Sequence, residues 1–304
     1  MRAVYMIFLM ATVTLQAQEV RETRTRRIKL PDNDISFISA VSPDGKKILV
    51  SGPGYKGIFL TGKRGGKVTR ISDAPGAGYE PRFSEDGRYL FYREDEFPDQ
   101  KKVSSLLQYD MTTGNRKVVA AKVPDLAAPA FSGNNMHYRS GGKLNTVKLD
   151  NASLKSAGSE IFVISEDLTP VVYINGEGYP VKPNGDGSYI WASLSPDRSK
   201  LLYYFAGQGT FVSDLEGKIL FSPGQISAPR WLSDQMVIGM EDHDDGYRVT
   251  GSEIVCFSLS SGKRINLTST PERAEMYPVP LPGGKNVVFQ TPEGEIFIMR
   301  LKVK

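Results

Sequence analysis

The chain has 304 residues, a formal net charge of +4 and one cysteine. This charge argues against a strongly basic nucleic-acid-binding face, and the one arginine-rich stretch, residues 21–29, fits an edge strand better. A single cysteine excludes an intrachain disulfide, so apolar packing must stabilise the fold, and Cys256, within an apolar run, is expected to be buried.

Residues 1–17 have the pattern of a secretory signal peptide. Arg2 precedes an apolar run that continues to Leu15, and Ala17 provides the small residue expected at a cleavage point. The run is short of the roughly 20 residues that a membrane-spanning helix needs. No cysteine follows that could carry a lipid. We therefore expect a periplasmic or secreted protein, without stable membrane insertion, whose residues 18–304 form a single domain.

A turn motif recurs along this domain between apolar, strand-like runs. Its clearest copies are Ser-Pro-Asp-Gly at Ser42, Ser-Glu-Asp-Gly at Ser84 and Ser-Pro-Asp-Arg at Ser195, and altered copies follow Phe131, Trp231 and Leu281. Ser, Pro and Gly at these positions favour a tight turn between strands. Successive copies are 37 to 63 residues apart, which brackets the roughly 40–50 residues of a four-stranded propeller blade. The pattern predicts an all-β, six-bladed β-propeller.

The individual strands can be placed within these units. In the second unit we expect strands over residues 81–83, 89–93, 107–111 and 116–120. The longest interval, 63 residues, contains Asn175-Gly176, a two-residue hairpin signal. We interpret residues 170–183 as an extra hairpin on the third blade, either a decoration or a docking element for a partner.

The sixth unit ends one strand short. It supplies strands over residues 276–279, 287–290 and 295–302, and the chain then stops. An extended run near the N-terminus, residues 23–30, is predicted to pair with this last blade. That pairing would close the ring and cover two exposed strand edges at once.

The repeated segments resemble a known family. Residues 81–88, Pro-Arg-Phe-Ser-Glu-Asp-Gly-Arg, are similar to the core motif of the TolB-like six-bladed β-propellers, which are WD-repeat-like, and residues 194–197 and 228–231 keep parts of it. The likeness spans residues 39–299. It implies an exported propeller that binds a protein or another ligand in the cell envelope. The α/β domain that precedes the TolB propeller has no counterpart here, nor does the hydrolase domain of the prolyl oligopeptidases.

Few residues suggest catalysis. The chain has no Gly-x-Ser-x-Gly motif, and His137 and His243 are its two imidazoles. We therefore favour a non-catalytic binding scaffold. The alternative is a carbohydrate-active propeller, a polysaccharide lyase or hydrolase with a metal-assisted site at the channel mouth.

One strongly acidic segment runs from Glu241 to Asp245. Asp242, Asp244 and Asp245 are weak candidates for a divalent cation site, because Ca²⁺ prefers several oxygen ligands. The other interpretation is a solvated turn that could recognise a basic partner. No other cofactor is predicted.

Antiparallel strands place the second-to-third loops and the fourth-to-first connections at one end of the ring, which we call the loop face. Aromatic and charged residues there predict a recognition surface for an envelope protein, a peptide or a glycan. The predicted residues are Tyr79, Glu80, Asp186, Tyr189, Trp191, Glu241, Asp242, His243, Asp244, Asp245, Arg273, Glu275 and Tyr277. For Tyr79, Trp191 and Tyr277, packing between blades is an equal alternative. Arg82 and Arg230 are interpreted as structural ion-pair partners.

Overall fold

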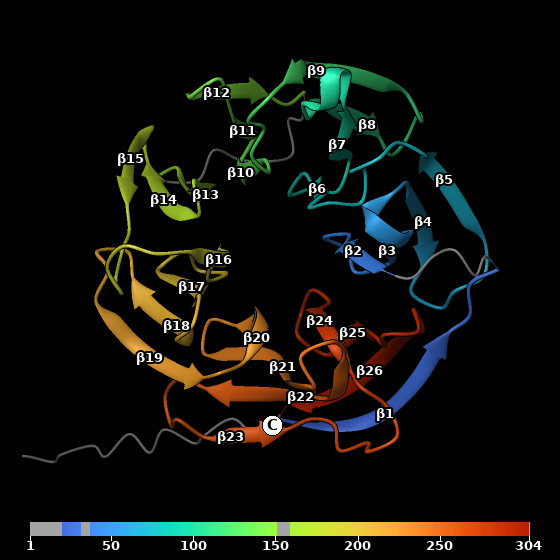
Figure 1. The fold of residues 1–304 in the computed structure, drawn as a ribbon, viewed down its shortest axis with the longest axis vertical. Helices are drawn as coiled ribbons and strands as arrows, with labels where there is room; N and C mark the ends of the chain where they lie inside the picture. The colour runs from blue at the N-terminus through green and yellow to red at the C-terminus, as the bar shows by residue number, and fades with distance from the viewer. Residues whose placement is uncertain (1–19, 32–36, 151–158, 304) are drawn as a thin grey trace, which may run out of the picture.

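The computed structural model describes residues 20–31, 37–150 and 159–303, so the predicted signal peptide lies outside the described residues. These residues form antiparallel sheets arranged radially around one axis (Figure 1). Two short 3₁₀ segments, Pro53–Tyr55 and Pro98–Gln100, are the helical elements in this part of the chain. No described helix is long and apolar enough to cross a membrane.

The described chain makes seven sheets, which we number as blades in chain order. Blade 1 contains β2 (Phe37–Val41), β3 (Lys47–Ser51), β4 (Ile58–Gly62) and β5 (Val68–Ser72). Blade 2 contains β6 (Arg82–Phe83), β7 (Tyr89–Glu96), β8 (Val103–Asp110) and β9 (Arg116–Val123). Blade 3 contains β10 (Ala130–Ser132), β11 (Asn135–Ser140) and β12 (Lys143–Lys148), and blade 4 contains β13 (Ile161–Glu166), β14 (Thr169–Ile174) and β15 (Glu177–Pro180).

The remaining three blades have four strands each. Blade 5 contains β16 (Tyr189–Leu194), β17 (Lys200–Phe205), β18 (Gly209–Asp214) and β19 (Ile219–Gly224). Blade 6 contains β20 (Ser227–Ser233), β21 (Met236–Asp244), β22 (Val249–Ser258) and β23 (Arg264–Asn266). Blade 7 combines β24 (Met276–Pro280), β25 (Asn286–Gln290) and β26 (Ile296–Val303) with β1 (Val20–Ile28) from the other end of the chain.

The prediction of six blades is therefore wrong. The 63-residue interval between turn motifs holds an additional sheet. Residues 170–183 are not an extra hairpin on blade 3, because β14 pairs with β13 and β15 pairs with β14 to form blade 4. The turn between β13 and β14 is Asp167-Leu168, with φ of 46° and 61°. Two left-handed residues make a two-residue hairpin turn, so the Ser-Pro-Asp-Gly motif that marks the other blades is missing from this one.

The hydrophobic core is divided among the spaces between neighbouring blades. Ile48 and Val50 of blade 1 pack against Val288 and Ile298 of blade 7, and comparable clusters lie at the other junctions. Each sheet is thus apolar on both faces, as expected for a strand array buried from two sides. Cys256 lies inside the cluster between blades 6 and 7, as predicted, and burial raises the pKa of its thiol to about 12.

The predicted closure of the ring is confirmed. Strand β1 pairs antiparallel with β26 from Val20, opposite Val303, to Ile28, opposite Ile296, with one bulge after Glu22 (Figure 1). Val20 joins the cluster between blades 6 and 7, and Ile28 joins the cluster between blades 7 and 1. The N-terminal strand therefore contributes to two blade junctions.

The recurring turn is stabilised by the serine and aspartate of the motif. In blade 5, Ser195 Oγ donates to Asp197 Oδ1 at 2.5 Å and accepts from the backbone N–H of Lys200 at 3.0 Å. Burial opposes ionisation of Asp197, but hydrogen bonds from Ser195 and Ser199 outweigh it, and the pKa of Asp197 falls to about 2. The same serine-to-aspartate bond, 2.6 Å long, occurs at Ser42 and at Ser84.

Removing one buried contact of β1 should weaken the closure. Ile28 is 2% exposed, so Ile28→Ala should lower the free energy of unfolding by about 3 kcal/mol through lost burial and a residual cavity. Chemical denaturation measures the change. Arg24→Ala, an exposed change on the same strand, is the control and should shift the free energy by less than about 0.5 kcal/mol. Equal effects of the two substitutions would contradict the role of Ile28.

Candidate functional site

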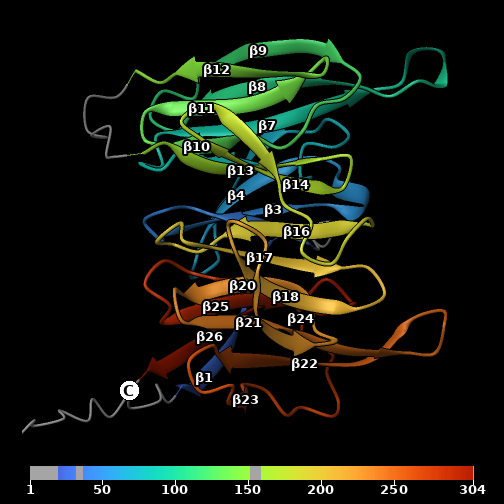
Figure 2. The ribbon, with the colours of Figure 1, turned by 90° about the vertical axis from the view of Figure 1, so that its left-hand side faces the viewer.

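The loop face holds a pocket of about 850 Å³ between blades 6, 7 and 1. In Figure 2 the ring is seen edge-on, and the β7–β8 and β21–β22 connections extend beyond it on the same side. The pocket is lined by residues from second-to-third loops and a fourth-to-first connection, together with Phe37 of β2 and Met276 and Tyr277 of β24. The loops of this face therefore converge around the pocket. The lining residues are Phe37, Pro53, Arg248, Val249, Thr250, Pro271, Glu272, Arg273, Ala274, Met276, Tyr277, Gln290, Thr291, Pro292 and Glu293.

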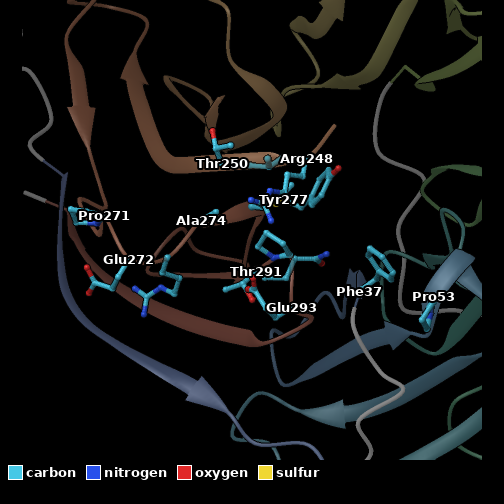
Figure 3. Close-up of a pocket in the computed structure, with 15 residues that line it drawn as sticks. Phe37, Pro53, Arg248, Thr250, Pro271, Glu272, Ala274, Tyr277, Thr291 and Glu293 are labelled. Carbon is cyan, nitrogen blue, oxygen red and sulfur yellow. The ribbon is translucent and has the colours of Figure 1, made fainter. Parts of the chain in front are cut away.

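Two of the predicted residues, Arg273 and Tyr277, line this pocket. In Figure 3, Phe37 and Pro53 of blade 1 lie at one end of it and Pro271 and Glu272 at the other. The pocket therefore bridges the junction between the first and last blades. Ile28 of β1 packs in the apolar cluster between these two blades.

Aromatic side chains gather beside the pocket. We call Phe37, Tyr55, Tyr79 and Tyr277 the aromatic cluster. The rings of Tyr55 and Tyr79 make an edge-to-face contact at 5.3 Å, and Phe37 lies 5.7 Å from Tyr55. Tyr277 lines the pocket together with Phe37, and burial is the main cause that raises its pKa. Three of the four rings stay well exposed: Tyr55 43%, Tyr79 42% and Tyr277 38%.

Neighbouring residues hold Tyr79 in the cluster. The guanidinium of Arg93 lies 5.0 Å above its ring, a favourable cation–π arrangement, and Arg93 is itself anchored by donating to the carbonyl of Leu126. The preceding residue, Gly78, passes so close to blade 1 that an added Cβ would lie 2.2 Å from the Cβ of Ser51. This approach needs glycine and brings Tyr79 against Tyr55.

The sequence analysis missed Phe37, Tyr55 and Arg93. Tyr55 belongs to Pro53-Gly54-Tyr55, the second-to-third loop of blade 1. Its place in a second-to-third loop is the same signal that marks the other loop-face residues. Phe37 and Arg93 carry no such signal, because they lie in strands and reach the site through tertiary packing.

Three predicted residues occupy equivalent places: Trp191 and Tyr277 lie on the innermost strands β16 and β24, and Glu80 lies just before the innermost strand β6. Glu80, Trp191 and Tyr277 have left-handed backbones, with φ of 50°, 55° and 52°, and Ala228 of blade 6 has φ of 47°. Register shifts accompany Trp191, Ala228 and Tyr277, so a bulge re-aims the chain at each of these positions. A left-handed non-glycine residue costs of order 1–3 kcal/mol and is often found at binding sites.

The acidic segment is mostly strand rather than loop. Glu241 to Asp244 lie in β21, and Asp245 begins the turn. Glu241 pairs with Arg264 through two hydrogen bonds of 2.5 and 3.1 Å. Asp244 and Asp245 accept backbone N–H groups of the turn, and these bonds lower the pKa of Asp245.

This arrangement favours the structural interpretation of the acidic segment. Alternation along a strand turns Asp242 and His243 to opposite faces of the β21–β22 hairpin. Within residues 20–31, 37–150 and 159–303, no three His, Cys, Asp or Glu side chains gather as a metal site would require.

Two of the predicted surface residues are buried. Tyr189 is 1% exposed, and its hydroxyl donates to the carbonyl of Gly185 at 2.8 Å. Asp186 beside it is exposed and pairs with Lys182 at 2.7 Å. Trp191 is half-buried and contacts the edge of Tyr204 at 5.6 Å. Blade 5 thus contributes less to the surface than the sequence suggested.

Glu275 is the second buried residue. It is 0% exposed, and burial raises its pKa even though Arg273 donates to its Oε1 at 2.9 Å. The guanidinium of Arg273 also lies 4.6 Å from the ring of Phe297. Arg273 is therefore fixed from two sides, and it presents a rigid cation at the pocket wall.

The two histidines lie apart. His137 of blade 3 is buried, stacks on Phe162 of blade 4 at 3.9 Å and bonds to Thr146 and Glu160. His243 lies exposed on the β21–β22 hairpin. His137 therefore joins two blades, away from the loop-face pocket.

Comparison with known proteins gives the fold. No protein-family profile and no curated protein matches the sequence. Among solved structures, a chain of the mitotic checkpoint complex is similar with a TM-score of 0.58 and 12% identity, over 99% of this chain and 97% of that one. The C-terminal WD40 domain of Sif2 also gives a TM-score of 0.58 and 12% identity, over 88% and 81%. The fold is a WD40-like β-propeller.

A propeller enzyme is also similar to the chain. Oligogalacturonate lyase in complex with manganese has a TM-score of 0.51 and 14% identity, over 94% of this chain and 96% of the lyase. At these identities the likeness concerns the fold alone. Membership of the TolB-like family stays a prediction.

Strain at Glu80 can be measured with a pair of substitutions. Glu80→Ala and Glu80→Gly both remove the exposed side chain, but only glycine adopts φ of 50° freely. We expect the Gly variant to unfold with a free energy about 0.5–1 kcal/mol higher than the Ala variant, from the balance of strain and unfolded-chain entropy. Glu22, on strand β1, is the control, and there alanine should be the more stable. The same order at both positions would disprove the strain.

The buried imidazole should resist protonation. Burial lowers the pKa of His137 more than Glu160 raises it. Near pH 6.5 the imidazole is therefore protonated to a greater extent in the unfolded chain than in the folded protein. Stability should therefore fall as the pH drops below about 6.5. NMR titration of the Hε1 signals, assigned with His243→Gln, should give His137 a midpoint below 6.5. A midpoint above that value would refute this environment.

Proposed function

We propose that this protein is an exported, non-catalytic propeller that binds a protein or another envelope ligand through its loop face. The observation that supports this most directly is the aromatic cluster beside the loop-face pocket. Tyr55, Tyr79 and Tyr277 come from three blades, expose a large part of their rings and have charged neighbours. Exposed tyrosines next to arginine are typical anchors of binding surfaces.

The proposed surface is rigid. Its residues lie on innermost strands or on short loops that hydrogen bonds and tight backbone contacts hold in place, as at Gly78. Side chains held in this way lose little conformational entropy when a partner binds, which favours affinity. The pocket beside the cluster could accept a protruding side chain of the partner, with the ion-paired Arg273 offering N–H donors at its wall.

Export is proposed from the sequence. The pattern of residues 1–17 supports secretion. A single cysteine is compatible with an oxidising compartment, because the chain has no second cysteine with which an intrachain disulfide could form. A partner is therefore proposed among envelope or extracellular components.

The alternative, a carbohydrate-active enzyme, has weaker support. It would need an imidazole near the site, and His137 is engaged between blades 3 and 4 while His243 lies on an exposed hairpin. Turnover of oligogalacturonate that disappears in His243→Ala would reverse the order of the two functions.

Site-specific photocrosslinking tests the binding function. A photoreactive phenylalanine analogue replaces Tyr55 or, as the control, Tyr179, another exposed tyrosine, which lies on β15 of blade 4. In an envelope extract, the probe at Tyr55 should capture a defined partner that the probe at Tyr179 does not. The partner should then bind Tyr55→Ala or Tyr277→Ala at least about 30-fold more weakly than the wild type, as for an interface hot spot.

The control variant decides the interpretation. Tyr179→Ala should bind the captured partner as well as the wild type does. Unchanged affinity in both cluster variants, or equal losses in all three, would mean that the loop face is not the binding surface.

A further inference from the structure

The positive charges that line the loop-face pocket are already compensated. Arg273 and Arg248 are the arginines among the lining residues. Arg273 Nη2 lies 2.8 Å from Glu275 Oε1. Arg248 Nε lies 3.7 Å from Asp245 Oδ2. Each guanidinium therefore faces a carboxylate of this protein, and neither leaves a free positive charge in the pocket.

Two lining glutamates have no such compensation. Glu272 and Glu293 are exposed, and neither forms an ion pair within residues 20–31, 37–150 and 159–303. Figure 3 shows both side chains at the pocket, with Glu272 at the end away from Phe37. The charge that remains is negative, and a negative pocket favours a positively charged ligand.

Aromatic rings lie along the same pocket. Phe37 and Tyr277 line it, and the ring of Tyr55 lies 5.7 Å from that of Phe37. Pro53, which begins the loop that carries Tyr55, also lines the pocket. The face of an aromatic ring is negative and attracts a cation, a guanidinium group most often. The rings and the glutamates thus select the same kind of ligand.

A buried amide indicates that the ligand is a polypeptide. Gln290 lines the pocket although it is only 3% exposed. Its Oε1 accepts the backbone N–H of Ile38 at 2.8 Å, which fixes the orientation of the amide. No residue in the described part of the chain accepts a hydrogen bond from its Nε2. Since buried polar groups are normally paired, this donor fits a main-chain carbonyl of a bound segment.

We propose that the pocket takes an arginine side chain of a partner protein, between the aromatic rings and the two glutamates, with a main-chain carbonyl of the same segment on Gln290. Arginine fits better than lysine, because its guanidinium is planar and weakly hydrated, stacks on rings and offers a carboxylate two parallel N–H donors. The inference rests on the proposed binding function of the loop face, and it adds the chemistry of the partner.

Three pentapeptides with blocked ends test the proposal on the purified protein. Each has four glycines around a central residue, which is arginine, lysine or citrulline, the uncharged analogue of arginine. Titration at pH 7 and low salt is followed through the NMR signals of the protein. We expect the arginine peptide to saturate, to bind more tightly than the lysine peptide and to bind at least about fivefold more tightly than the citrulline peptide. Added sodium chloride should weaken it.

Variants locate the binding. Glu272→Gln combined with Glu293→Gln should weaken the arginine peptide about fivefold, because both free charges are lost. Glu216→Gln is the matched control, since Glu216 is an exposed glutamate in the turn between β18 and β19, at the other end of the ring, and its affinity should equal that of the wild type. Tyr277→Leu should weaken the peptide about threefold, whereas Tyr277→Phe, which keeps the ring, should not.

The opposite results overturn the proposal. Equal affinities for the arginine and citrulline peptides, or equal effects of the double variant and Glu216→Gln, would disprove a pocket for a cation. Tighter binding of the lysine peptide would disprove the assignment to arginine. A partner captured at Tyr55 whose affinity the double variant leaves unchanged would refute this inference and still support the loop face as the binding surface.

Discussion

Pairing of β1 with β26 is the contact on which the rest of the molecule depends. Every blade buries both faces against its neighbours, so an open ring would leave two apolar faces and two strand edges in water. The N-terminal strand meets this constraint twice, since Val20 packs into one junction and Ile28 into the next. Closure thus couples residues almost 300 positions apart.

The candidate site lies at this closure. The pocket and the aromatic cluster combine loops of blades 6 and 7 with loops of blades 1 and 2, which are adjacent because the ring is closed. The left-handed residues Trp191 and Tyr277 lie on the innermost strands of blades 5 and 7, and Glu80 lies just before that of blade 2. A closed ring can support such local strain, because the packed junctions on both sides of each strand restrain it.

Local turn motifs predicted most blades correctly, whereas burial of individual side chains depends on tertiary packing. The serine–aspartate turn is a local hydrogen-bonded unit, so its copies were recognisable and marked true blade starts. The first two strands of blade 4 are joined by a different turn, Asp167-Leu168. Because this turn lacks the motif, the sequence pattern predicts a hairpin of blade 3 in place of a separate blade. Glu275 and Tyr189 are predicted on the surface because they belong to connections at the loop face, yet tertiary packing buries both side chains.

The sequence alone specifies the antiparallel strands, the turns and the closing strand, because alternating apolar residues and turn chemistry act over a few neighbouring positions. The number of blades and the meeting of Tyr55 with Tyr79 depend on tertiary structure. These features join residues far apart in the chain, and their distances are set by how seven sheets fill a circle. No short stretch of sequence carries that information.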